Sequence, residues 1–188
     1  ALILTGALSD GAATDTLVKR GAGKLTLNCS SNSATGGLQI EAGTVELIGE
    51  NSLGSGKITI QNGTISTNMG GGSLNLTNHF TFEGGTGGEF SIATNDILTL
   101  TGTIDGSLSL IKTGAGKLAF MSADNTRTGT MDIQEGTVAV SSSANIGGAL
   151  TIGNGVLATP ASFSHTGSIT LSHADAAIDV ESGISTLS

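Results

Sequence analysis

The chain has few of the residues that normally fill or cross-link a compact globular core. Among 188 residues there is no Trp or Tyr, and there are five Phe, one Pro and one Cys, Cys29. Globular cores usually contain large aromatic side chains that fill volume. A single cysteine forms no disulfide within the chain, and we interpret Cys29 as a small buried residue. These shortages favour a thin, uniform core of Leu, Ile, Val and Ala.

Charge is also scarce. Charged residues make up 12% of the chain, with 15 acidic and 7 basic groups and a formal net charge of −8. Affinity for nucleic acid depends on Lys and Arg that neutralise phosphates, so this balance argues against nucleic acid as a partner. No apolar run approaches the ~18 residues of a membrane helix, so we expect no membrane insertion of this segment.

Short runs in which apolar and polar residues alternate are present throughout the chain. Examples are Leu25–Leu27, Ile58–Ile60 and Leu98–Leu100. A period of two predicts strands with one face in the core and one in water. Turn-forming pairs such as Asn62-Gly63 and Asn154-Gly155 separate the runs, and helical periodicity is absent. The sequence therefore predicts an all-β protein.

A long internal repeat organises these runs. Residues 17–47 align without a gap with residues 110–140, where each position lies 93 residues further on and 14 of 31 residues are identical. We divide the single domain into units of about 1–84 and 85–177, with a truncated third unit at 178–188. Short strands in the same order in both units favour a parallel β-solenoid over a sandwich or propeller. With three sides and roughly 20–25 residues per turn we expect about eight turns, or about 40 Å of rod at ~4.8 Å per turn.

The repeat resembles the autotransporter-associated β-strand repeat. That family typically has Val-Lys-x-Gly-x-Gly-x-Leu-x-Leu, then Asn, x-Thr-Gly-Gly and a final Ala-Gly-Thr-Leu. The second copy departs at Thr130 and Glu135, which we expect in turns and on the surface. The motif residues, which we assign a structural role, are Lys19, Gly21, Gly23, Leu25, Asn32, Gly36 and Gly43, and Lys112, Gly114, Gly116, Leu118, Asn125, Gly129 and Gly136.

This resemblance implies a right-handed parallel β-helix that is exported through a C-terminal β-barrel outside this chain, with no cofactor. It implies a location on the surface of a Gram-negative cell or in the medium. We expect a non-catalytic passenger segment that acts as a surface adhesin or aggregation stalk. The alternative is a released virulence factor or toxin whose rod engages a host receptor. The expected partners are a host-cell surface protein or glycan, or a second copy of the passenger.

Several sequence features could in principle form a binding site. A phosphate-binding loop at Gly21–Lys24 is excluded because Leu25, and Leu118 in the second copy, replace the hydroxyl that would reach Mg²⁺. We interpret Lys19, Lys24, Lys112 and Lys117 as solvated surface lysines, with the two copies about four turns apart. The alternative is a weak site for an acidic glycan.

Catalysis and metal binding have weaker support. Glu41 and Glu46 could face each other as a hydrolytic pair, which leaves a carbohydrate-active solenoid as a third hypothesis. The second copy has Gln134 and Ala139 at these positions, and the chain lacks the Trp and Tyr that commonly stack on sugars. His79, His165 and His173 have no metal-ligand spacing, so we expect neither an enzyme nor a metal protein.

Overall fold

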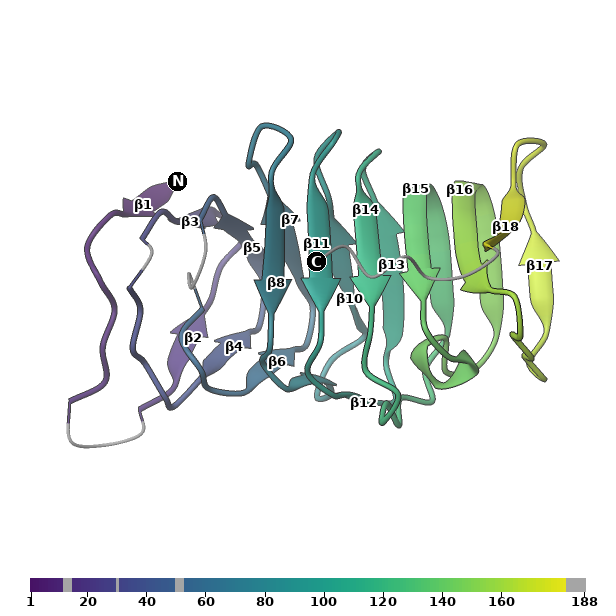
Figure 1. Ribbon diagram of the computed structural model, residues 1–188. Coiled ribbons are helices and arrows are strands. Elements are labelled where there is room, and N and C mark those ends of the chain that lie inside the picture. The colour runs from purple at the N-terminus through teal and green to yellow at the C-terminus, as the bar shows by residue number, and fades with distance from the viewer. Residues whose placement is uncertain (12–14, 30, 50–52, 182–188) are drawn as a thin grey trace.

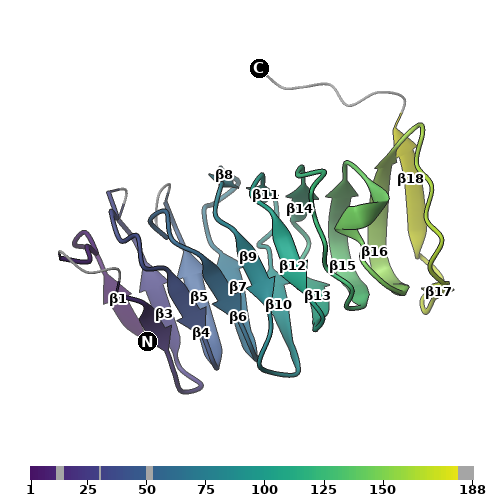
Figure 2. The same ribbon diagram turned by 90° about the horizontal axis from the view of Figure 1, so that it is seen from below.

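The chain winds into a rod of short parallel strands (Figure 1). The computed structural model describes residues 1–11, 15–29, 31–49 and 53–181. In these ranges every strand pair is parallel, and the helical element is one 3₁₀ turn, η1 (Ser143–Asn145). Seen from a second side, the strands lie next to each other along the whole rod (Figure 2). The predicted all-β parallel solenoid is confirmed.

The strands form three faces. Face A is a five-stranded sheet. Faces B and C join into one 13-stranded sheet because the long strands β15 and β16 each cross from B to C. Face A contains β2 (Leu17–Lys19), β4 (Leu38–Ile40), β6 (Ile58–Ile60), β9 (Phe80–Phe82) and β12 (Ile104–Gly106).

Face B is the longest. Its members are β1 (Leu2–Leu4), β3 (Lys24–Leu27), β5 (Gly43–Leu47), β7 (Gly63–Thr67), β10 (Gly87–Ser91), β13 (Ser109–Thr113), the first halves of β15 (Met131–Val140) and β16 (Leu150–Pro160), and β17 (Ile169–Leu171). Nine levels in the described chain make about eight turns, as expected. Successive levels are 19 to 25 residues apart, as shown by the pairs Ile133–Ile152 and Ile65–Phe90.

Face C covers the second half of the rod. It contains β8 (Ser73–Leu76), β11 (Ile97–Leu100), β14 (Lys117–Phe120), the second halves of β15 and β16, and β18 (Ala177–Glu181). The part of the expected third unit after Glu181 lies outside the described residues.

Inward side chains stack on inward side chains of the next turn. On face B, Leu25, Val45 and Ile65 follow one another in register and are at most 7% exposed. The middle of the rod contains more aromatic volume than the expected aliphatic core. There Phe80 and Phe82 each contact Phe90 edge-on, with ring centroids 5.9 and 6.2 Å apart. These phenyl rings lie in the longest turn, between Ile65 and Phe90, and are fully buried.

The two copies of the repeat occupy different faces. Lys19 lies on face A, whereas the equivalent Lys112 lies on face B. Leu25 likewise lies on face B, and Leu118 lies on face C. Four turns, from β2 to β12 on face A, lead from Lys19 to Gly106, and the chain then passes on to face B. The unit of 93 residues is thus four turns plus one face, rather than the expected four turns.

Candidate functional site

Lys19 and Lys112 point into the rod. Lys19 is 8% exposed and pairs with Ile40, whereas Lys112 is fully buried and lies between Phe90 and Ile133. The prediction that these two lysines are solvated is wrong. In Leu17-Val18-Lys19 the strand alternation places the lysine on the same side as the inward Leu17.

Each buried ammonium is surrounded by backbone carbonyl groups. Lys19 Nζ donates to the oxygens of Arg20 (3.1 Å), Gly21 (2.6 Å) and Ala42 (2.8 Å). The corner that follows the lysine supplies two of these oxygens, and the next turn supplies the third.

The second copy repeats this arrangement on another face. Lys112 Nζ donates to the oxygens of Thr113 (2.7 Å), Gly114 (2.6 Å) and Glu135 (3.1 Å). Burial lowers the pKa of Lys112 to about 8, although the nearby Glu135 carboxylate acts in the opposite direction. At pH 7 the side chain is therefore still an ammonium ion.

We call the bend that follows each buried lysine, residues 20–24 and 113–117, the lysine corner. It contains one residue more than the corresponding bend of the next turn. Five residues separate the inward Lys19 from the inward Leu25, whereas four separate Ile40 from Val45 in the paired strands. The second copy has the same difference. The longer corner contains Gly21 at φ +73°, and its equivalent Gly114 has the same angle. This is the left-handed region that favours glycine.

The remaining motif glycines bring the backbones of neighbouring turns close together. Gly43 (φ +74°) and Gly136 (φ +73°) lie against the lysine corner of their own copy, and a Cβ on either would overlap carbonyl oxygens there. A Cβ on Gly116 or Gly129 would overlap a carbonyl of the preceding turn, whereas Gly23 has open space beside it.

The motif asparagines tie each turn to the previous one. Asn32 Oδ1 accepts the backbone N–H of Leu8 (2.6 Å), and Asn125 Oδ1 accepts that of Ile104 (2.7 Å). Asn32 Oδ1 also accepts the thiol of Cys29 (3.0 Å), which is buried as expected. The backbone N–H of Gly36 likewise donates to the Asp10 carboxylate of the previous turn (2.8 Å).

A third buried cation, Arg127, was missed by the sequence reasoning. It is 3% exposed, and its guanidinium donates to the carbonyls of Ile146 and Thr130. Burial lowers its pKa to about 10. The equivalent residue of the first copy is Ala34, so the repeat gave no signal for a buried cation here.

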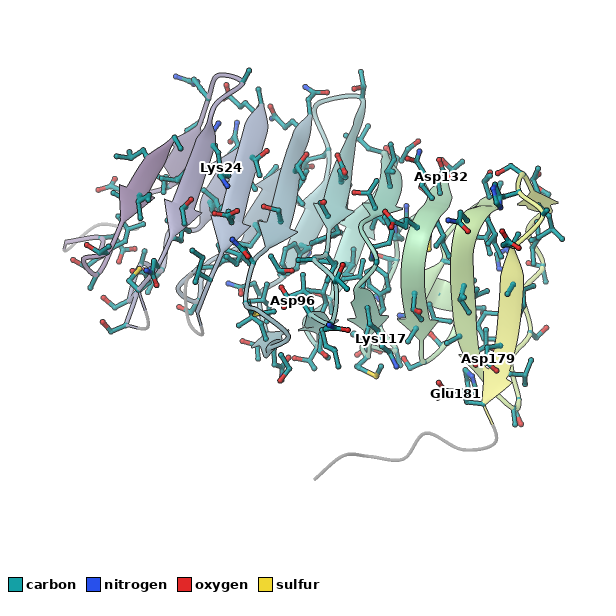
Figure 3. All side chains as sticks on the ribbon, turned by 90° about the horizontal axis from the view of Figure 1, so that it is seen from above. Lys24, Asp96, Lys117, Asp132, Asp179 and Glu181 are labelled. Atoms are coloured by element: carbon teal, nitrogen blue, oxygen red, sulfur yellow. The ribbon has the colours of Figure 1, made fainter. Side chains whose placement is uncertain are left out.

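The outward lysines do not form a basic patch. Lys24 projects from face B and binds Glu46 at 2.6 Å, whereas Lys117 projects from face C (Figure 3). The four motif lysines are therefore divided among three faces, two of them pointing inward. This arrangement removes the basis for a lysine-lined site for an acidic glycan.

The candidate hydrolytic pair is occupied by basic partners. Glu41 binds Arg20 at 2.8 Å, and this hydrogen bond is the main cause that lowers the pKa of Glu41. At Glu46, burial favours a raised pKa, but hydrogen bonds from Lys24 and Thr26 outweigh it, so the pKa is lowered. A glycosidase needs one carboxyl group with a raised pKa to protonate the leaving group. Neither side chain suits that role.

The histidines do not converge. His79 binds Asp105 at 2.9 Å, and His173 lies 3.5 Å from Asp175. Within the described ranges no three His, Cys, Asp or Glu residues gather as a metal site would require. In the same ranges no helix has the length and apolarity needed to cross a membrane.

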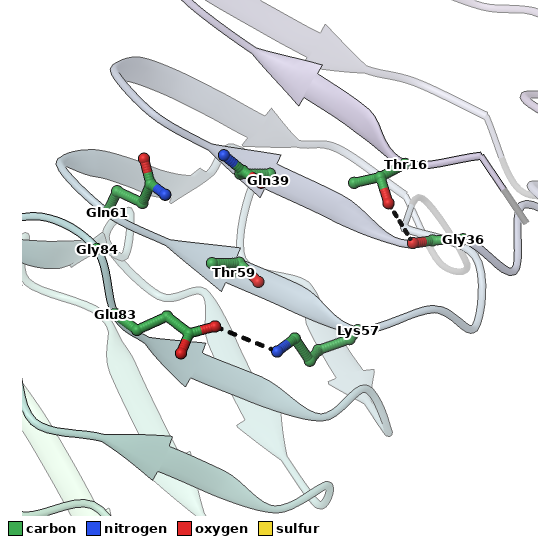
Figure 4. Close-up of a pocket in the computed structure, with 8 residues that line it drawn as sticks. All are labelled: Thr16, Gly36, Gln39, Lys57, Thr59, Gln61, Glu83 and Gly84. Atoms are coloured by element: carbon green, nitrogen blue, oxygen red, sulfur yellow. Dashed lines mark hydrogen bonds and ion pairs between the residues drawn. The ribbon is translucent and has the colours of Figure 1, made fainter.

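A shallow polar groove runs along face A (Figure 4). It continues past the exposed pair Lys57–Glu83, whose charged atoms are 3.3 Å apart. The rest of the lining is mainly hydroxyl and amide groups, from Thr16, Gln39, Thr59, Gln61, Thr81, Ser107, Thr126 and Thr128. An open groove of this kind suits contact with an extended molecule rather than enclosure of a small substrate.

Comparisons with known proteins identify the same two repeats. The family model of the passenger-associated-transport-repeat matches residues 17–47 and 110–140, which are the two copies of the repeat. The Adhesin BmaC autotransporter of Brucella suis biovar 1 (strain 1330) is 30% identical over 139 residues. That alignment covers 73% of this chain and 4% of the adhesin, so the chain spans a small part of its relative. No solved structure shows significant similarity.

The parallel solenoid and the two matched repeats define the chain as a repeat-bearing β-rod of the kind found in exported passengers. More particularly, it is autotransporter passenger sequence that carries two passenger-associated transport repeats. Its location is accordingly the bacterial cell surface or the surrounding medium.

Proposed function

We propose that this segment is a non-catalytic part of a surface adhesin, which acts as a stalk and as a contact surface for a host-cell protein or glycan, or for a second passenger. The main support is the division of side chains in the rod. Inward positions stack into one continuous core, and outward positions such as Gln39, Thr59 and Asp105 form polar rows along the faces. The similarity to an autotransporter adhesin supports the same function.

Contact along the groove on face A would use many weak polar interactions. Its hydroxyl and amide groups can donate and accept hydrogen bonds, and Lys57 and Glu83 are exposed enough to exchange partners. The carboxylates that could serve catalysis are instead held by Arg20 and Lys24. These features favour binding without chemistry.

The proposal is tested with beads that carry the folded chain, added to cultured epithelial cells. We expect the beads to bind, and the double variant Lys57→Ala/Glu83→Ala to bind less while its melting temperature is unchanged. Heat-unfolded chain provides the control. Prior protease treatment of the cells abolishes binding to a protein, whereas glycosidase treatment abolishes binding to a glycan.

Three results would contradict the proposal. Equal binding of folded and unfolded chain would show that the rod surface recognises nothing. Turnover of a polysaccharide by the chain would favour the carbohydrate-active alternative. Release of most of the full-length passenger into the medium, with injury to host cells, would favour the toxin alternative.

A further inference from the structure

The two lysine corners contain the same cluster of oxygens in different surroundings. Lys19 lies on β2, the first strand of face A, and has a register partner on one side, whereas Lys112 is stacked between two strands in the middle of face B. Both ammonium groups nevertheless contact two carbonyls of their own corner and one of the next turn, at 2.6 to 3.1 Å. Because the geometry is retained while the face changes, the corner backbone itself must create the cluster.

Neither buried ammonium has a carboxylate partner. Among the described residues, the lysines that form ion pairs are the outward Lys24 and Lys57. Lys112 has no exposure to water, and its ammonium group donates to peptide carbonyls, while the Glu135 carboxylate acts on it only at longer range. Three carbonyl oxygens around an N⁺–H₃ group match its three donors.

We propose that this corner is a binding site for a primary ammonium ion, built by the backbone and filled by the chain's own lysine. We call it the corner cradle. In the second copy it consists of the carbonyl oxygens of Thr113, Gly114 and Glu135, and in the first copy of those of Arg20, Gly21 and Ala42. The site lies inside the rod and is independent of the function proposed for the outward faces.

A free alkylammonium ion should therefore replace the side chain when it is removed. Lys112→Ala removes three carbons and the ammonium group, which is the size of propylammonium. The variant leaves a cavity and three unpaired acceptors, so we expect its melting temperature to fall by about 6–12 °C. Propylammonium chloride at pH 7 should restore at least half of that loss with saturable dependence on concentration.

Matched controls separate the cradle from general salt and packing effects. Tetramethylammonium chloride at equal ionic strength has no N–H donor and should restore nothing. Lys112→Met fills the space of the lysine side chain with an apolar chain but leaves the three carbonyl acceptors unpaired. Its melting temperature should therefore be lower than that of the parent protein, and propylammonium should not raise it. Lys117→Ala, which removes a lysine of face C from the same copy, should melt within about 2 °C of the parent.

The proposal is wrong if both salts act alike on Lys112→Ala, if propylammonium restores Lys112→Met, or if Lys112→Ala loses no stability. If Lys112→Ala fails to fold, the same series with Lys19→Ala tests the first cradle near the end of the rod. The parent protein gives an independent readout by NMR. Of its five lysines, we expect two to show slowly exchanging ammonium protons, and five rapidly exchanging groups would overturn the proposal.

Discussion

At the scale of single residues, the lysine and several glycines of the repeat motif form one corner of the solenoid. Lys19 supplies the donors, Gly21 adopts the left-handed backbone, and Gly43 lets the next turn approach. The same three roles recur at Lys112, Gly114 and Gly136 on another face. The local backbone geometry, rather than a ligand, requires these residue types at these positions.

Gly43→Ala tests how closely the turns must approach. The new Cβ would lie 2.6 Å from the Gly23 oxygen and 2.6 Å from Lys19 Nζ, at a residue with φ +74°. Steric overlap and left-handed strain together should lower the free energy of unfolding by about 2–4 kcal/mol. Urea titration followed by circular dichroism measures the change.

Gly23→Ala is the control for this experiment. It lies in the lysine corner that Gly43 packs against, has no atom within 4 Å of a new Cβ and does not adopt a positive φ. We expect its free energy of unfolding to change by about 0.5 kcal/mol or less. A similar loss at both glycines would show that the close approach at Gly43 does not matter.

At the scale of elements, loops are tied to the loops of neighbouring turns. Asp96 lies between β10 and β11, is fully buried, and accepts the N–H groups of Met69 (2.9 Å) and Gly71 (2.8 Å) from the loop between β7 and β8. Burial by itself raises the pKa of Asp96, but these donors outweigh it, so the pKa is lowered.

Asp96 should therefore contribute to loss of stability in acid. Its folded pKa lies below the unfolded value of about 3.9, so its contribution is complete above that pH and disappears as the pH falls through the folded pKa. Asp96→Asn should cost about 1–3 kcal/mol at pH 7, because one amide group cannot replace both acceptors. Melting curves of parent and variant from pH 7 to pH 2 should converge below about pH 4. A constant difference would contradict this role.

At the scale of the whole molecule, the repeat rotates around the rod. Equivalent residues of the two copies face different sides, as Lys24 and Lys117 do in Figure 3. A ligand that recognised the motif surface would meet it on one face and then on the next. The outward rows that run along a single face instead combine residues from different places in the repeat.

A pair of cysteines tests this rotation. Ser91 on β10 and Thr113 on β13 are register partners on face B. Neighbouring strands are about 4.8 Å apart, which lies in the Cα range of disulfides. In a Cys29→Ser background, oxidation of Ser91→Cys/Thr113→Cys should form an internal disulfide that mass spectrometry detects as the loss of two hydrogens.

Ser66→Cys/Thr113→Cys is the matched control. Ser66 is the partner of Ser91 one turn earlier, so it lies two strand spacings from Thr113, which is too far for a bond. Bridging of this pair, or failure of the first pair, would show that β13 does not follow β10 on face B.

The sequence was sufficient to predict the strands, the parallel solenoid and the passenger family, because alternation and turn residues act locally and repeat in register. It also predicted that Thr130 and Glu135 are exposed, as they are. Sequence reasoning predicts surface positions for Lys19 and Lys112 because charged side chains are rarely fully buried. The alternation of Leu17 and Lys19 indicates the opposite, and the structure agrees with the alternation.

The sequence alone thus determined which segments form strands and which side chains could face the core, since both depend on a period of two within a few residues. Only the tertiary structure decided on which face each copy lies and what surrounds each lysine. The face that the second copy occupies depends on the summed lengths of the four turns before it. A difference of a few residues in that sum would place the second copy on another face. The cradle depends on a carbonyl from the next turn, Ala42 or Glu135, which reaches the ammonium only after the coils have stacked.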